Sequence, residues 1–79
     1  MNLMKKDTAI ERELTIFEAI RRTTERFPYI QCATQALINI KLRPIDGIDE
    51  CEVYHNEELI NKSYRVPRYE LKQPWKVVS

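Results

Sequence analysis

Glycine, histidine and cysteine are scarce in this 79-residue chain, and each shortage excludes a class of site. With one glycine, the chain has no glycine-rich loop that could cradle phosphates. A single histidine, His55, excludes a zinc site with two histidine ligands. Two cysteines, Cys32 and Cys51, are too few for a secreted disulfide scaffold. Both lie in apolar-patterned stretches, so we expect small buried thiols in a reducing compartment, the cytoplasm.

The remaining reactive groups form no recognisable catalytic or metal-binding pattern. Cys51 and His55 would lie about 13 Å apart on one strand, too far for a nucleophile and its base. The acidic residues around Gly47 lack the register of a helix–loop–helix calcium site. We therefore expect no catalytic residues, no metal and no cofactor, and we expect that the protein is not an enzyme.

Long apolar runs and a large net charge are also missing. No apolar stretch approaches the roughly 20 residues that span a bilayer, and residues 1–7 carry no secretory signal, so no membrane association is expected. The formal charge is +1, which argues against strong non-specific binding to nucleic acid. At this length we expect one small domain, residues 1–79, with a flexible N-terminus over residues 1–7.

A long helix is the clearest predicted element, over residues 8–27. Thr8 and Glu11 match a capping box, and Pro28 ends the helical pattern. Five apolar residues and one threonine recur every three or four positions. This spacing predicts one buried helix face made of Ile10, Leu14, Phe17, Ile20, Thr24 and Phe27.

Strands are predicted in the second half of the chain. Residues 29–37 are ambiguous and fit a short second helix better than a strand. Residues 38–43 and 50–55 alternate with period two and form a hairpin around Gly47. Residues 62–72 alternate again, although Pro67 requires an edge or a break. Residues 75–79 could add a further strand.

The fold class predicted from these elements is α+β: one long N-terminal amphipathic helix packed on a three- or four-stranded antiparallel meander. A core of this size is marginal, and homodimerisation through a strand edge or helix flank would enlarge it. The size and plain composition are those of small phage and mobile-element proteins, which is a hint from composition alone.

Charge is segregated along the sequence. Residues 46–58 contain six acids and no base, and they predict an acidic surface that includes Asp49, Glu50, Glu52, Glu57 and Glu58. Residues 59–79 contain five bases and one acid. Basic and aromatic residues interleave there, which is compatible with partner binding, with protection of an edge strand, or with pairing to the acidic hairpin.

Two functions remain open from the sequence. The leading hypothesis is a non-catalytic protein-interaction module, a small regulator or inhibitor that docks on a larger protein. Arginine, tyrosine and tryptophan are enriched at binding hot spots, and the residues expected at the contact are Arg65, Arg68, Tyr69, Lys72 and Trp75. The alternative is a nucleic-acid-binding regulator that also uses Arg21, Arg22, Arg26, Lys62 and Lys76, with aromatic rings of segment 62–76 stacking on bases.

Overall fold

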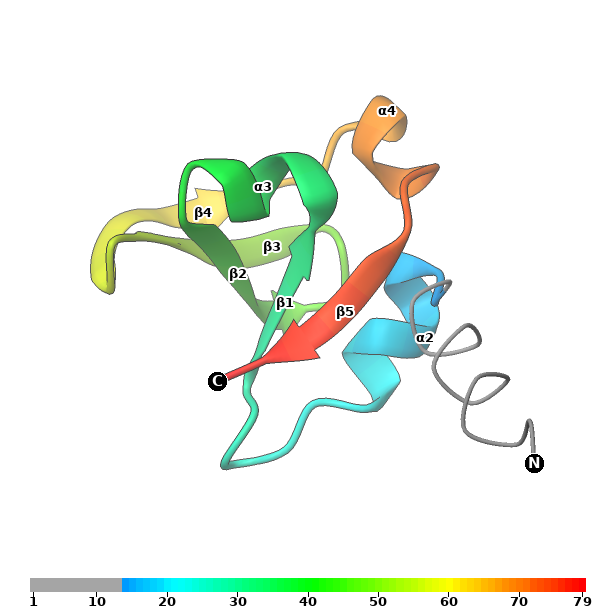
Figure 1. Ribbon diagram of the computed structural model, residues 1–79, viewed down its shortest axis with the longest axis horizontal. Coiled ribbons are helices and arrows are strands. Elements are labelled where there is room, and N and C mark those ends of the chain that lie inside the picture. Colours follow the sequence, from blue (N-terminus) through cyan, green and yellow to red (C-terminus); the bar gives the residue numbers. More distant parts are fainter. Residues whose placement is uncertain (1–13) are drawn as a thin grey trace, which may run out of the picture.

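Five antiparallel strands form a single sheet in the computed structural model, which describes residues 14–79 (Figure 1). The strand order across the sheet is β4-β3-β2-β1-β5. In chain order the strands are β1 (Tyr29–Cys32), β2 (Ile40–Asp46), β3 (Glu50–His55), β4 (Glu58–Tyr64) and β5 (Trp75–Val78). Within residues 14–79 three short helices accompany them: α2 (Ile16–Arg21), α3 (Ala33–Leu37) and α4 (Arg68–Leu71).

The predicted long helix is wrong, because none of the helices in residues 14–79 exceeds six residues. Leu14 is extended and bridges to Trp75, and a second capping box, formed by Thr15 and Glu18, starts α2 at Ile16. Residues 1–13, which include the predicted cap at Thr8 and Glu11 and the flexible segment 1–7, lie outside the described residues.

α2 ends early because threonine side chains bind the backbone instead of continuing the helix. The Thr23 hydroxyl donates to the Ile20 carbonyl at 2.9 Å, and Thr24 Oγ1 accepts from the Phe27 N–H at 3.1 Å. The buried face also differs from the predicted one. Ile16 and Ala19 are buried, whereas Phe17 and Phe27 are about half exposed.

The hairpin was predicted with nearly the right bounds: β2 and β3 pair from Ile40↔His55 to Asp46↔Glu50. The ambiguous segment 29–37 divides into a strand that was missed, β1, and the short helix α3. The predicted strand over 62–72 is wrong in its bounds: β4 begins at Glu58 and ends before Pro67, where α4 follows. The tail after Pro74 is β5, which pairs with β1 rather than extending the meander.

The core lies on one face of the sheet. Ile30, Leu42, Cys51, Val53 and Trp75 are buried on β1, β2, β3 and β5, and they form one cluster with residues of α2 and with Val66. Both cysteines are buried and form no disulfide, which confirms the prediction of buried thiols. Because side chains alternate along strands, the intervening residues of these strands project from the opposite, polar face.

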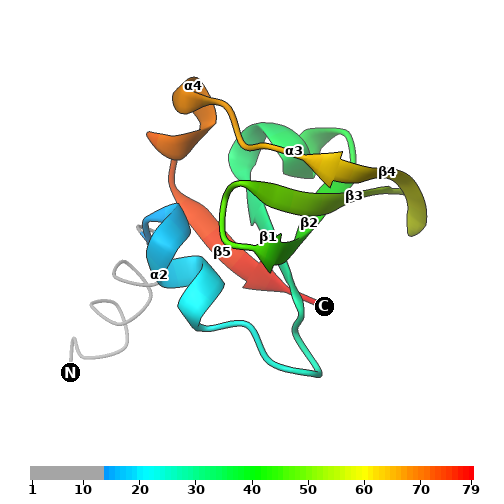
Figure 2. The same ribbon diagram turned by 180° about the vertical axis from the view of Figure 1, so that it is seen from behind.

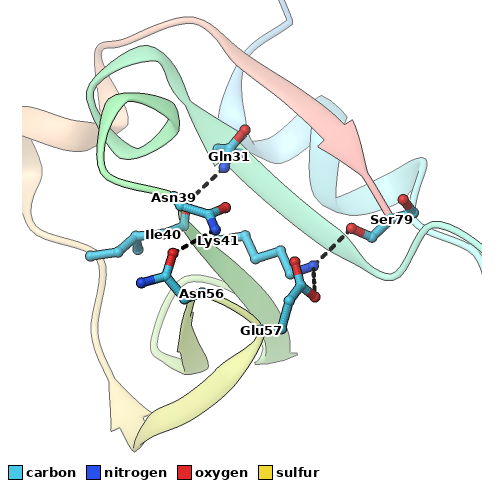
Figure 3. A network of polar contacts seen from close by, with 7 residues as sticks. All are labelled: Gln31, Asn39, Ile40, Lys41, Asn56, Glu57 and Ser79. Carbon is cyan, nitrogen blue, oxygen red and sulfur yellow. Dashed lines mark hydrogen bonds and ion pairs between the residues drawn. The ribbon is translucent and has the colours of Figure 1, made fainter.

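A buried lysine ties three chain segments together on the polar face (Figure 3). Lys41 is 5% exposed; its Nζ lies 2.8 Å from Glu57 Oε1 and 2.8 Å from the Ser79 carbonyl oxygen. It also lies 4.2 Å from the centre of the Tyr29 ring. Lys41 thus joins β2 to the β3–β4 turn and to the end of β5.

A pair of asparagines joins the turn before β2 to the β3–β4 turn. Asn39 and Asn56 both have left-handed backbone angles, with φ of 55° and 51°, which asparagine tolerates better than most residues. Asn39 Nδ2 donates to Asn56 Oδ1 at 2.8 Å, and the Asn56 N–H donates to the Asn39 carbonyl at 3.1 Å (Figure 3). The two turns therefore support each other.

Candidate functional site

The segment from Arg65 to Pro74, which we name the α4 turn, carries most of the residues predicted to contact a partner. It projects from the end of the sheet, above the start of β5 (Figures 1 and 2). Pro67 caps α4 in an extended conformation, and its carbonyl accepts the N–H groups of Glu70 and Leu71. A proline at each end of the helical turn restricts the conformations of this segment.

Glu70 anchors the α4 turn to the core. Its carboxylate oxygen accepts the Tyr64 hydroxyl at 2.9 Å, and its backbone carbonyl accepts the Trp75 indole N–H at 2.9 Å. Burial, together with the hydrogen bond to Glu70, holds the pKa of Tyr64 well above its ordinary value. Tyr64 therefore remains a neutral donor, and the turn is fixed from both its side chain and its backbone.

Four residues point away from the core on this anchored turn. Tyr69 is 64% exposed, and Arg65, Arg68 and Lys72 are also exposed. Arg65 forms an ion pair with Asp49, with 3.7 Å between Nε and Oδ1, at an exposed position. Such a pair contributes little to stability. The result is one exposed phenol among three cationic side chains.

Trp75 does not belong to this exposed set, although the sequence placed it there. It is 1% exposed and lies in the core between Cys32, its partner in β1, and Leu14. Its predicted place at a partner contact is therefore corrected: Trp75 supports the α4 turn from beneath. Tyr64 is also turned inward, toward Glu70.

Of the additional basic residues of the alternative hypothesis, Arg22 and Lys76 line one groove, which the α4 turn reaches at Pro74. Arg21 ends α2 and Arg26 lies in the loop between α2 and β1, and both are exposed. Lys62 is exposed on β4 and Lys76 on β5, at opposite edges of the sheet.

The predicted acidic surface is partly neutralised within the chain. Asp49 pairs with Arg65 and Glu57 with Lys41, while Glu50 and Glu58 are exposed at the start of β3 and β4. Glu52 accepts the Tyr54 hydroxyl at 2.9 Å and lies 3.2 Å from Arg43 Nη1. These two hydrogen bonds lower the pKa of the Glu52 carboxyl. Pairing of the basic segment with the acidic hairpin, one of the alternatives left open by the sequence, therefore occurs between Arg65 and Asp49.

Sequence reasoning missed Lys41 and Glu70, which hold the polar face and the α4 turn. From the local sequence, Lys41 is expected to face solvent. The residue that helps to cover it, Ser79, is 38 positions away, so no local pattern indicates the burial. Glu70 was counted only as the single acid of a basic segment. The one available signal was a lone acid six residues after Tyr64, whose carboxylate could accept the tyrosine hydroxyl.

Burial makes the Cys51 thiol inert in the native state. Its pKa is raised to about 11 from its ordinary 9.0, because burial disfavours the thiolate. We expect both thiols to react with a colorimetric disulfide reagent at pH 8 about a hundredfold or more slowly in the native chain than in urea. A thiol that reacts at its unfolded rate in native buffer would contradict this placement.

The same shift predicts a pH dependence of stability. Between pH 9.0 and about 11 the unfolded thiol loses its proton while the folded one retains it, so the unfolded state binds fewer protons. The free energy of unfolding should therefore fall as the pH rises through this window. Urea titrations of the wild type and of Cys51→Ala should differ in this slope, and equal slopes would argue against a buried Cys51.

Comparison with known proteins finds no match to a family model, to a curated protein or to a solved structure. Across residues 14–79, none of the helices is long and apolar enough to cross a bilayer. In the same part of the chain, no three histidine, cysteine or acidic residues are close enough to hold a metal ion.

Proposed function

We propose that this chain is a non-catalytic protein-interaction module whose α4 turn docks on an acidic surface of a larger protein, which it regulates or inhibits. The observation that carries the proposal is Tyr69, which is 64% exposed on a turn that Glu70 ties to Tyr64 through its carboxylate and to Trp75 through its backbone carbonyl. An exposed aromatic ring normally costs solubility, and a rigid turn that presents one reduces the entropy lost on binding.

The charges around Tyr69 define the partner. Arg65, Arg68 and Lys72 are exposed on the same turn, and its one carboxylate, Glu70, is already bound to Tyr64. A complementary surface would offer carboxylates around an apolar pocket for the phenol. Charge complementarity of this kind speeds encounter, and the buried ring supplies most of the affinity.

The same contacts support a protein rather than a nucleic acid as the partner. Of the three aromatic residues that could stack on bases in segment 62–76, Tyr64 donates to Glu70 and Trp75 is buried. Only Tyr69 of these three remains available, and stacking on one aromatic ring provides only weak binding to single-stranded nucleic acid.

A double variant of the α4 turn tests the proposal. Immobilised wild-type protein, Arg68→Ala/Tyr69→Ala and the matched control Phe17→Ala/Arg21→Ala would be incubated with nuclease-treated lysate of the source cells. The control also removes one arginine and one half-exposed aromatic ring, but from α2. Captured proteins would be quantified by mass spectrometry and the partner then purified for binding measurements.

We expect the wild type and the control to capture the same protein. The α4 variant should bind that protein at least about tenfold more weakly, as expected for loss of a hot spot. Binding should also weaken as salt is raised, because the surrounding contacts are ionic. Equal capture by all three proteins, or capture that depends on nucleic acid, would contradict the proposal.

A further inference from the structure

The two edges of the sheet differ in their ability to accept another strand. β4 pairs with β3 through two register shifts, and the Ser63 N–H is occupied by Asn61 Oδ1 at 2.9 Å. Bulges and locally satisfied backbone groups are devices that keep an edge from pairing. β5, by contrast, pairs with β1 through four consecutive residues without irregularity. Only the β5 edge retains the geometry of a regular strand.

The outer edge of β5 already accepts one backbone contact. The Trp75 N–H points away from β1 and donates to the Leu14 carbonyl at 2.9 Å. Because backbone groups alternate along a strand, the N–H and C=O of Val77 point toward the same edge. Among residues 14–79, Leu14 is the one residue bridged to this edge, so a strand that continued the ladder would next pair at Val77.

A groove of about 660 Å³ lies beside β5 and extends onto β1 and α3, since Gln31, Ala33 and Ala36 line it as well. Leu14, Phe27, Trp75 and Val77 give it an apolar lining, and its size is within the range of ligand sites. Arg22 and Lys76 are its charged members, and its lining includes no carboxylate among the described residues. The groove therefore favours an occupant with both apolar and acidic side chains.

We propose that the β5 edge binds an extended segment of a partner protein in which apolar and acidic residues alternate. This surface adjoins the α4 turn at Pro74 but does not use its exposed residues Arg68 and Tyr69. Trp75 and Val77 lie on one face of β5 and Lys76 on the other, as strand alternation requires. A paired strand of period two would place its apolar side chains beside Trp75 and Val77 and its carboxylates beside Lys76. Main-chain hydrogen bonds would supply affinity and the groove would supply specificity.

The probe is an acetylated and amidated hexapeptide of alternating valine and glutamate, compared with one of alternating valine and lysine. Trp75 is the only tryptophan of the chain and lines the groove, so its fluorescence reports binding directly. Hydrogen exchange at the Val77 amide, followed by NMR, reports the new backbone bond. Both measurements use the full chain.

The acidic peptide should bind about tenfold or more tightly than the basic one, and Lys76→Glu should reverse this preference. Lys62→Glu, the same charge change on the β4 edge, is the matched control and should leave both affinities unchanged. Val77→Pro removes the outward N–H and should abolish binding, since an edge strand tolerates proline where the N–H faces outward. Far-UV circular dichroism would check that this variant is folded.

Three results would overturn the proposal. Equal affinity for the two peptides would remove the charge argument. A Val77 amide that is protected without peptide at every protein concentration would mean that the chain itself, such as residues 1–13, occupies the edge. Protection that rises with protein concentration, together with a dimer in sedimentation, would make a second copy the occupant. Arg68→Ala/Tyr69→Ala should leave peptide binding intact, so this test and that of the α4 turn can fail separately.

Discussion

Replacement of Trp75 by alanine is expected to remove about 3–5 kcal/mol of stability, which is most or all of what a domain of this size has. The indole is 1% exposed, and Trp75 joins β1, the Leu14 bridge and the α4 turn in one place. Urea unfolding followed by far-UV circular dichroism measures the loss, because the variant has no tryptophan left to report fluorescence.

Trp75→Phe separates packing from hydrogen bonding. It retains an aromatic ring in the core but leaves the Glu70 carbonyl without the indole donor, so we expect a loss of about 1–2 kcal/mol. The α4 turn should also loosen, which amide exchange over residues 68–73 would detect. An alanine variant within 1 kcal/mol of the wild type would mean that Trp75 is not the centre of the core.

The burial of Trp75, which was predicted to be at a partner contact, shows what could not be predicted from the sequence. A tryptophan between Pro74 and a lysine, in a stretch rich in arginine and tyrosine, has the composition of a binding surface. Its burial depends on β5 pairing with β1, a contact between residues more than 40 positions apart. No local pattern specifies that pairing, whereas the β2–β3 hairpin depends only on neighbours around Gly47 and could be predicted.

The long helix failed for a different reason. Thr8 with Glu11 and Thr15 with Glu18 both match a capping box, and the apolar spacing around Leu14 suits a helix in either case. The backbone contact between Leu14 and Trp75 prevents a helix from running continuously through Leu14, because Leu14 must be extended to reach β5. A tertiary contact thus outweighed the helical preference of the local sequence.

Part of the candidate site was accessible from the sequence. Pro67 indicated a break in the strand, and the basic residues around Tyr69 were expected to be outward. The rigidity of the turn was not, since it depends on Glu70 meeting Tyr64 and Trp75 once the sheet has formed. Composition can thus predict which residues are exposed there, but the interactions that hold them depend on the strand order.

Lys41→Glu is the second substitution expected to have a large effect, with a loss of about 3–5 kcal/mol. The new carboxylate would lie among the Glu57 carboxylate and the Ser79 carbonyl, which now accept from the ammonium group at 2.8 Å each. At a position where Lys41 is 5% exposed, water cannot fully solvate the added charge.

Lys41→Met is the matched control, because it retains the aliphatic stem and removes only the charge. The Glu57 side chain is 72% exposed and can be hydrated when its partner is lost, so we expect a change within about 1 kcal/mol. Restoring a cation at the turn with Lys41→Glu/Glu57→Lys should recover part of the loss but not all of it, since the Ser79 carbonyl still faces a carboxylate. Urea unfolding midpoints of the three variants measure these changes in stability. If Lys41→Glu were as stable as Lys41→Met, the contacts of Lys41 with the β3–β4 turn and with the end of β5 would not stabilise this face of the sheet.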